Sequence, residues 1–297
     1  MNKRNLAVLV GLVSLAFAFQ AVDAEEPNWT PVYQGVDLAT YNVDNPQQRF
    51  VVARIDAQAE GVEFLATPPN KDFAPDTRET YRQTTAMFLK EQGLALAVNA
   101  NFYNPFGAKT IPVGGDSNLI GLGVSDGFVE SAPQQGYPSF IVKKNGEVEI
   151  RQVAADENLD DVWQAVSGST IVLQDGKVVE SQDASVHPRT AVGYSQDKRF
   201  VYFLVVDGRQ KGYSVGATTK NVGEALLECG AYVGLNLDGG GSTTMVVRDE
   251  NDEPVVLNRP CNGTKDKLRF NANAIGVRAK GKPSKDVREF SSYDVKL

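Results

Sequence analysis

The sequence of 297 residues has one histidine, His187, and two cysteines, Cys229 and Cys261. Zinc sites and binuclear metallophosphatases need clustered histidine, cysteine and carboxylate ligands, so this inventory disfavours both. A site built only from oxygen ligands, for Ca²⁺ or Mg²⁺, stays open. The two cysteines could pair in an oxidising compartment or remain separate buried thiols, and the sequence does not choose between these outcomes.

The sequence also lacks a hydrophobic run long enough to span a membrane after its first segment. Residues 6–19 are mostly apolar, follow Lys3 and Arg4, and are shorter than the roughly 20 residues that a spanning helix needs. Small residues at 22–24 offer a cleavage site, so residues 1–24 are predicted to be a secretory signal peptide. The alternative is an uncleaved anchor. The signal predicts export, to the periplasm or to the medium.

Basic residues are outnumbered by acidic ones, and the net charge is −7. This balance argues against a general nucleic-acid or anionic-membrane binder, although a local basic pocket is compatible with it. The 42% of hydrophobic residues is typical of a folded globular protein. The chain has no internal repeat and no change in composition that would mark a linker.

Short apolar runs separated by turn signals predict a strand-rich fold. Helical spacing predicts helices over residues 80–92 and from about 221 to 229, and a short helix is expected within 158–165. Asn221 and Glu224 resemble a capping box. We predict an α+β fold, a single strand-rich domain over residues 25–280 with a mixed central β-sheet and a few packed helices. A charged C-terminal tail, 281–297, is expected to be peripheral.

The most informative stretch is residues 232–247, in which an apolar strand ends in Asp238 and three glycines follow. Gly239, Gly240 and Gly241 can take backbone angles closed to other residues and allow a ligand close to the main chain. Bare N–H groups in such a loop could bind an anion beside the carboxylate. A tight hairpin turn with Asp238 as turn former is the alternative.

Four other polar clusters follow or precede predicted strands. They are Asn99 with Asn101, residues 187–190 with His187 and Arg189, residues 207–209 with Asp207 and Arg209, and residues 258–260 with Asn258 and Arg259. Arginine can hold a phosphate or carboxylate through two parallel hydrogen bonds, and asparagine amides suit sugar hydroxyls. Taken singly, each cluster also has a structural interpretation as a turn, a surface ion pair or a strand end.

Two further motifs fail on their context. Residues 212–216 match the G-x-S-x-G pattern, but no strand leads into Ser214 and the only histidine precedes it. The glycine run before Ser242 lacks the lysine of a phosphate-binding P-loop. A serine hydrolase and a nucleoside-triphosphatase are therefore not indicated.

The ordered clusters resemble the phosphodiester glycosidase domain family. The resemblance rests on residues 98–103, 188–193, 206–209, 230–232, 236–245 and 258–260, and with the closing strand it extends over roughly 98–277. Two places depart from the family pattern. Relatives often have glycines at the positions of Ala100 and Asn101, and residues 268–274 replace a Glu-Arg-Pro-Val-Ala-Asn-Ala run, of which Arg269 remains.

The resemblance implies hydrolysis of the glycosidic C–O bond of a sugar-1-phosphodiester, of the α-N-acetylglucosamine-1-phosphate type. Our hypothesis assigns Asp238 as the central catalytic carboxylate, which attacks the anomeric carbon or activates water, and Asp207 as the second one. Arg189, Arg209 and the glycine loop would hold the phosphate, with His187 as a donor. The other expected substrate-binding residues are Asn99, Asn101, Asn236, Ser242, Asn258 and Arg259. No cofactor is expected, and a divalent cation such as Ca²⁺ stays open.

Two other functions are compatible with the sequence. A non-catalytic protein could use the same pocket to bind an exopolysaccharide or cell-wall glycan. A divalent-metal-dependent phosphodiesterase could place oxygen ligands around Asp207 and Asp238. In each case the expected partner is a glycan or sugar phosphate, not a nucleic acid. The sugar, the stereochemical outcome and the oligomeric state are left undetermined.

Overall fold

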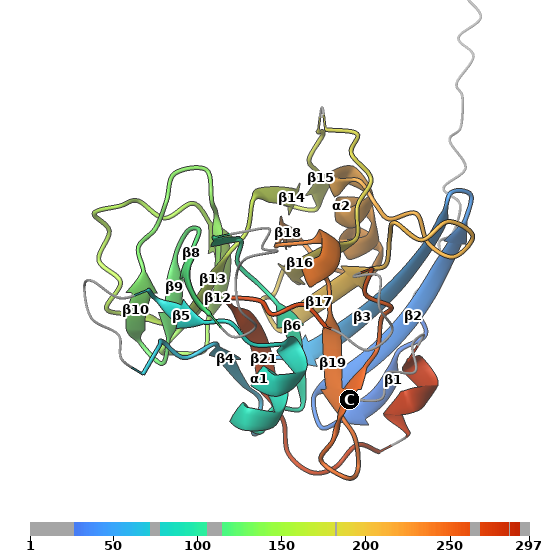
Figure 1. Cartoon of the computed structure of the whole chain (residues 1–297), viewed down its shortest axis with the longest axis horizontal. Coiled ribbons are helices and arrows are strands. Elements are labelled where there is room, and N and C mark those ends of the chain that lie inside the picture. Colours follow the sequence, from blue (N-terminus) through green and yellow to red (C-terminus); the bar gives the residue numbers. More distant parts are fainter. Residues whose placement is uncertain are drawn as a thin grey trace, which may run out of the picture.

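A computed structural model describes residues 27–71, 78–105, 115–181, 183–261, 268–284 and 286–291. Within them, strands form three larger sheets and one small sheet, accompanied by two α-helices (Figure 1). None of the described helices is long and apolar enough to cross a membrane. The predicted signal peptide, residues 1–24, lies outside the described residues.

The largest sheet has eight strands, and its recorded pairings are antiparallel. In spatial order they are β1 (Thr30–Tyr33), β2 (Val36–Asp44), β3 (Gln47–Asp56), β17 (Phe200–Val206), β16 (Arg189–Tyr194), β18 (Val233–Asn236), β14 (Thr170–Gln174) and β15 (Lys177–Val178).

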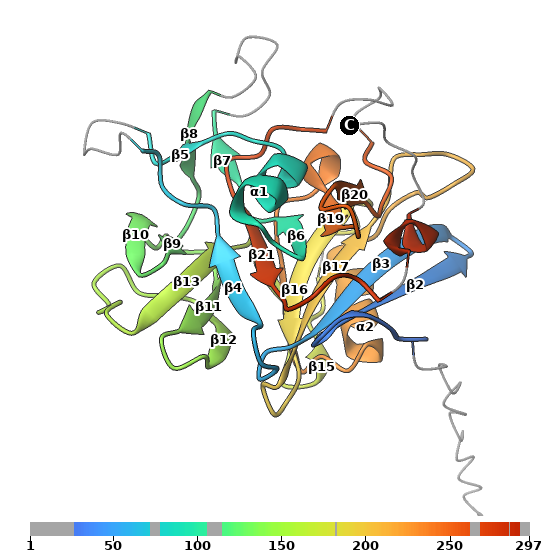
Figure 2. The same cartoon turned by 90° about the horizontal axis from the view of Figure 1, so that it is seen from below.

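The two five-stranded sheets lie against this one (Figure 2). The first five-stranded sheet contains β20 (Pro254–Val256), β19 (Met245–Arg248), β6 (Leu96–Asn99), β21 (Ala274–Arg278) and β4 (Glu63–Ala66). The second contains β10 (Phe128–Ser131), β9 (Gly123–Ser125), β13 (Val162–Ser167), β11 (Ser139–Lys143) and β12 (Val148–Arg151). The small sheet contains β5 (Thr80–Tyr81), β8 (Asp116–Leu119) and β7 (Tyr103–Asn104).

The main core lies where the three larger sheets meet, and β17 shows how the sequence builds it. Because side chains alternate across a strand, Val201, Phe203 and Val205 face this core while the intervening Tyr202 and Leu204 face the opposite side. That opposite side is covered by α2 (Thr219–Glu228). The strand is apolar throughout because both of its faces are buried.

Both helices begin at a threonine N-cap. Thr84 accepts a hydrogen bond from the N–H of Met87 and starts α1 (Thr85–Gln92), which packs on the outer face of the β6 sheet. Thr218 caps α2 in a capping box with Asn221. The helix therefore starts earlier than predicted, and the box is Thr218 with Asn221, not Asn221 with Glu224.

Several other expectations differ from the structure. The single mixed sheet is replaced by several sheets whose recorded pairings are antiparallel. Residues 162–165 belong to strand β13, not to a helix, because Val162 and Ala165 pack into a sheet-side core. Helix α1 starts at Thr85, after Tyr81 has paired in the small sheet.

The charged tail and the cysteines also have defined places. Val287, in the 3-10 helix η2 (Val287–Phe290), is fully buried in the main core, and Arg288 forms an ion pair with Asp249. This part of the tail is therefore not peripheral. Cys229 is buried, Cys261 is partly exposed, and both are free thiols.

Candidate functional site

The antiparallel order of three strands brings the polar clusters together. Strand β16 lies between β17 and β18, with Arg189 opposite Val206 and Ala191 opposite Asn236. The start of β16 therefore lies beside the ends of both neighbours. Three polar segments therefore meet at this single edge of the large sheet, namely residues 187–189, 207–209 and 237–241.

After β18 the chain crosses from the large sheet to the β6 sheet. Asp238 donates its N–H to the carbonyl of Ala100 (2.9 Å), and Leu237 donates to the carbonyl of Thr190 (2.8 Å). A 3-10 turn, η1 (Gly240–Ser242), follows before β19 begins. Asp238 is thereby held at the junction of two sheets, where its backbone is bonded to the segment after β6.

Asn99 holds this junction together from the inside. Its Nδ2 donates to the carbonyl of Asp238 (2.7 Å), and its Oδ1 accepts from Thr190 Oγ1 (2.7 Å) and from the N–H of Thr244 (3.1 Å). The side chain is fully buried. The amide that was predicted to bind a sugar hydroxyl instead positions the strand that carries Asp238.

A cavity of about 190 Å³ opens at this edge. One carboxylate, Asp238, and three guanidinium groups line it, together with an imidazole, an aromatic ring and the glycine loop. The lining residues are Phe102, His187, Pro188, Arg189, Arg209, Asp238, Gly239, Gly240, Gly241 and Arg269. This charge balance suits an anionic ligand.

Burial and hydrogen bonding act in opposite directions on Asp238. Its exposed fraction is 6%, and burial raises the pKa of its carboxyl group to about 6. A hydrogen bond from Ser242, the charge of Arg269 and the N–H of Gly239 (2.9 Å to Oδ1) each lower that pKa, but desolvation dominates. The carboxylate is ionised at neutral pH and more basic than an exposed aspartate.

His187 is kept neutral by its surroundings. Burial and the charges of Arg189 and Arg209 lower the pKa of its imidazole. Arg209 Nη2 lies 3.2 Å from His187 Nδ1, and because a guanidinium can only donate, Nδ1 accepts. The ring proton then sits on Nε2, which makes this nitrogen a hydrogen-bond donor.

The backbone places two of the arginines in different ways: Arg189 is held by hydrogen bonds to carbonyl groups, and Arg209 lies in a left-handed turn. Arg189 donates from Nε to the carbonyl of Ala217 (3.0 Å) and from Nη2 to that of Ser185 (2.9 Å). Burial lowers the pKa of the Arg189 guanidinium. Arg209 has a left-handed backbone, with φ of 59°, as the chain turns out of β17. Such backbone strain in a residue other than glycine is frequent at functional sites.

The glycine loop has a structural reason besides ligand approach. A Cβ on Gly239 would lie 2.6 Å from the carbonyl oxygen of Pro188, so only glycine fits there. The N–H of Gly239 bonds to Asp238, and that of Gly240 bonds to Pro188. Of the three glycines, only Gly241 has an N–H without a partner in the described part of the chain. The predicted anion cradle is therefore reduced to one backbone donor.

Asp207 does not line the cavity. Its carboxylate accepts from Asn258 Nδ2 (3.0 Å), from the N–H of Arg259 (2.8 and 2.9 Å) and from the Tyr213 hydroxyl (2.9 Å). Burial raises its pKa to about 6, while these donors lower it. Through these hydrogen bonds, Asp207 connects the loop after β17 to the loop after β20.

The remaining predicted residues are also engaged inside the fold. Asn101 bonds to backbone groups of Ile120, Leu122 and Ser167. Asn258 bonds to Met245 and Thr243 as well as Asp207. Asn236 donates to Ser169 and Leu237, and its buried Oδ1 has no hydrogen-bond partner within the part of the chain that the structure describes. The Arg259 guanidinium lies over the Tyr213 ring, 5.0 Å from its centroid, and Ser242 donates toward Asp238.

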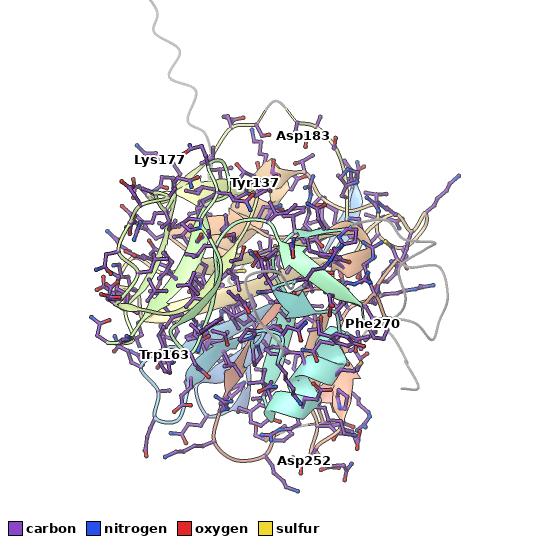
Figure 3. All side chains as sticks on the ribbon, turned by 60° about the vertical axis from the view of Figure 1, so that its left-hand side comes forward. Tyr137, Trp163, Lys177, Asp183, Asp252 and Phe270 are labelled. Carbon is purple, nitrogen blue, oxygen red and sulfur yellow. The ribbon has the colours of Figure 1, made fainter. Side chains whose placement is uncertain are left out.

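Three lining residues, Phe102, Pro188 and Arg269, were not among the predicted site residues. Arg269 reaches the cavity from the segment before β21, and its Nη1 lies 3.4 Å from Ser242 Oγ. Residues 268–274 differ from the family motif but keep its arginine, and this retained Arg269 was the sequence signal for a site residue. Phe102 belongs to the strand exit after β6 and was treated as part of a motif only. Its neighbour Tyr103 donates to the carbonyl of Phe270, which is labelled in Figure 3.

Comparison with known proteins identifies the family. The family model for phosphodiester glycosidases matches residues 92–278, and the chain belongs to this family. Membership indicates a glycosidase that acts on phosphodiesters. No curated protein matches the chain at a significant level.

Solved structures show the same fold. The catalytic domain of zebrafish N-acetylglucosamine-1-phosphodiester α-N-acetylglucosaminidase, auto-inhibited by its pro-peptide, has a TM-score of 0.62 and 17% identity, with 86% of this chain and 89% of that one covered. A hypothetical protein from Synechocystis has a TM-score of 0.58 and 13% identity, with 86% and 65% covered. A protein from Burkholderia pseudomallei K96243 has a TM-score of 0.54 and 14% identity, with 78% and 74% covered.

Proposed function

We propose that this protein hydrolyses a sugar-1-phosphodiester, of the α-N-acetylglucosamine-1-phosphate type, to free sugar and a phosphomonoester. The observation that carries the proposal is Asp238, a buried carboxylate that shares a small cavity with Arg189, Arg209 and Arg269. We further propose that the chain is exported, since residues 1–24 have the pattern of a signal peptide.

In the proposed reaction, water attacks the anomeric carbon and the bond from that carbon to the phosphate oxygen breaks. The electron pair leaves with the phosphate, and Asp238 takes the proton from the water. The guanidinium groups stabilise the charge that develops on the leaving oxygens. His187 Nε2 and the Gly241 N–H add uncharged donors. A phosphate leaving group is a weak base and needs no strong general acid.

A single displacement with inversion fits this set of residues better than a double displacement. Asp238 is the one carboxylate that lines the cavity in the described chain. Both mechanisms ordinarily use two carboxyl groups, but a phosphate leaving group removes the need for the general acid of an inverting enzyme, whereas retention still needs a nucleophile and a base. Asp207 would then act as a positioning residue, because its hydrogen bonds fix Arg259 and the Tyr213 loop. NMR of the first sugar released distinguishes the two outcomes by its anomeric configuration.

The alternatives from the sequence are less well supported. A divalent-cation site around Asp207 and Asp238 does not fit the donor set, since Asp207 already accepts hydrogen bonds from three donors and three guanidinium groups line the cavity with Asp238. Cleavage of the P–O bond instead of the C–O bond, tested with ¹⁸O-labelled water, would favour the metal-dependent phosphodiesterase. A glycan binder would bind sugar phosphates without turnover.

The decisive experiment measures sugar release from an α-N-acetylglucosamine-1-phosphodiester by wild type and by Asp238→Asn. Loss of the general base is expected to lower turnover about a thousandfold. Asp160→Asn makes the same chemical change at an exposed position and is expected to retain activity. Near-full activity of Asp238→Asn would remove this residue from the mechanism. Saturable binding of the phosphodiester without turnover by wild type would favour the binder.

A further inference from the structure

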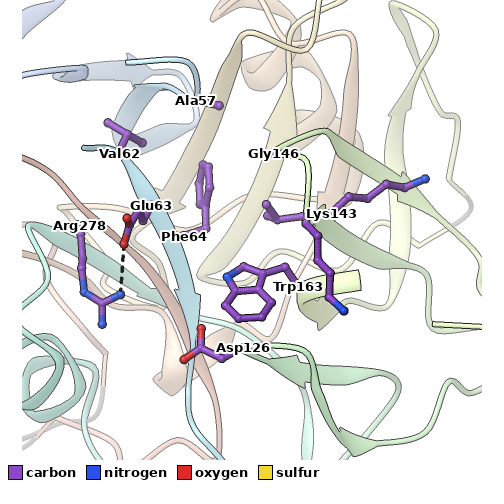
Figure 4. A pocket seen from close by; sticks show the side chains of 11 residues that line it. Ala57, Val62, Glu63, Phe64, Asp126, Lys143, Gly146, Trp163 and Arg278 are labelled. Carbon is purple, nitrogen blue, oxygen red and sulfur yellow. Dashed lines mark ion pairs between the residues drawn. The ribbon is translucent and has the colours of Figure 1, made fainter. Parts of the chain in front are cut away.

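A second cavity lies at the far end of the β6 sheet from Asp238 (Figure 4). Strand β21 begins at Ala274, beside Asn99, and ends at Arg278, which lines this second cavity. The volume is about 420 Å³, more than that of the arginine-lined cavity, and the two cavities share no lining residue. It opens between β4 and β21 on one side and β11 and β13 on the other.

An exposed indole ring forms one wall of this cavity. Trp163 is 39% exposed, whereas every other residue of β13 is buried. Leaving a large apolar side chain in water forgoes about 1.5–3 kcal/mol of burial. The other tryptophan, Trp29, is instead covered by Arg54, whose guanidinium lies 4.6 Å from its ring centroid. Of the two tryptophans, Trp163 is therefore the one whose ring is left exposed, and it lies at this cavity (Figures 3 and 4).

The ring of Trp163 is held in place by the turn between β9 and β10. Gly127 donates its N–H to the carbonyl of Trp163 (2.8 Å). A Cβ at Gly127 would lie 3.3 Å from Cε3 and Cζ3 of the ring, and Gly127 has φ of +78°. The turn therefore rests directly against the indole. An aromatic surface fixed in this way loses little entropy when a ligand binds.

Charged groups of both signs surround the ring, and most are already engaged. Asp126 accepts from Gln164 Nε2 (2.7 Å) through Oδ1 and lies near the indole in Figure 4. Lys143 lies 3.3 Å from Asp161, and Arg278 lies 3.7 Å from Glu63. Carboxylates offer acceptors and the cations offer donors, with no strong excess of either charge. Such a rim suits a ligand with many hydroxyl groups and little net charge.

We propose that this cavity, the Trp163 cavity, binds a pyranose unit of a neutral glycan. A pyranose ring has an apolar face that can pack on the indole. The hydroxyl groups at its edge can form hydrogen bonds with Asp126 and with the lysines that line the cavity. The volume is within the usual range of small-molecule sites. Nucleotides could stack on the indole as well, and they are the competing ligands in the test. The proposal is independent of catalysis at Asp238.

The test titrates the purified protein with neutral tetrasaccharides of glucose, mannose, galactose and N-acetylglucosamine. In a Trp29→Phe background Trp163 is the only tryptophan, so its emission reports on this cavity alone. At least one tetrasaccharide is expected to give a saturable change in emission, with the same Kd by calorimetry. Trp163→Ala and Asp126→Ala are each expected to weaken binding at least about tenfold.

Controls separate this cavity from the arginine-lined one. Tyr81→Ala removes another exposed aromatic ring and is expected to keep the wild-type Kd, as is Asp238→Asn. Trp163→Phe is expected to restore part of the affinity that the alanine variant loses. The proposal is overturned if no tetrasaccharide changes the emission, if only a nucleotide does so, or if binding survives Trp163→Ala but is lost in Asp238→Asn.

Discussion

Asp238 lies in an environment with opposing effects on its charge. Desolvation raises the pKa of the carboxyl group to about 6, although Ser242, Arg269 and the N–H of Gly239 favour the ionised form. A phosphate bound among the three arginines would oppose ionisation further. The basicity that suits Asp238 to accept a proton from water thus comes from burial, and Ser242, Arg269 and the N–H of Gly239 limit how far the pKa rises.

This balance predicts the acidic limb of the pH profile. Because the ionised carboxylate is the active form, kcat/KM is expected to fall about tenfold per pH unit below about 6. The measurement is the initial rate as a function of pH at low substrate concentration, because this rate reports the pKa values of groups in the free enzyme. A profile that stays flat between pH 5 and 8 would contradict the assignment of Asp238 as base.

At the scale of elements, the site depends on connections between strands of different sheets. Asn99, at the end of β6, bonds to Thr190 in β16, to the N–H of Thr244 before β19 and to the carbonyl of Asp238. The two sheets are thereby fixed at the point where the chain crosses between them. A change at Asn99 is therefore expected to affect both stability and catalysis without touching substrate.

Asn99→Ala is expected to lower the free energy of unfolding by about 3 kcal/mol, because it leaves several buried polar groups unpaired. Turnover is expected to fall as well, through misplacement of Asp238 and not through loss of a sugar contact. Asn118→Ala, at an exposed position, serves as control in urea unfolding. A variant with wild-type stability and only a raised KM would return Asn99 to the role of a sugar ligand.

At the scale of the whole molecule, buried acids make folding depend on pH. Glu130 is 3% exposed, and neither carboxylate oxygen has a hydrogen-bond partner among the described residues. Burial and, to a smaller extent, the charge of Glu79 raise its pKa well above the usual value. The folded protein therefore binds a proton at Glu130 more tightly than the unfolded chain does. The stabilising contribution is complete below the unfolded pKa and is lost as pH rises through the folded pKa.

Glu130→Gln, which resembles the protonated acid, is expected to reduce this dependence. Its urea midpoint should exceed that of wild type at pH 8 and should not exceed it at pH 4, where wild-type Glu130 is already protonated. Urea unfolding at the two pH values makes the comparison, with the exposed Glu91→Gln as control. An equal shift of the midpoint at both pH values would point to packing instead of ionisation.

Some of this organisation could be predicted from local sequence. Residues 174–176 carry the Asp-Gly signal of a tight turn and join β14 to β15 in a hairpin, and β16, β17 and β21 coincide with short apolar runs of the sequence. The helix over 158–165 was wrong, because Val162 and Ala165 fit a buried strand as well as a helix turn. Short apolar runs do not distinguish the two, and packing decides.

The sequence by itself determined the family, the strand-rich class and the polar clusters at strand ends, because these depend on the identity and order of nearby residues. Only the tertiary structure decided which clusters share a cavity. Asp207 and Asn99 have the residue types of a site, yet their hydrogen-bonding capacity is taken up by other strands and loops. Arg269 completes the cavity from a distant segment. Which donors remain for a ligand depends on contacts between residues far apart in the chain, and these exist only after folding.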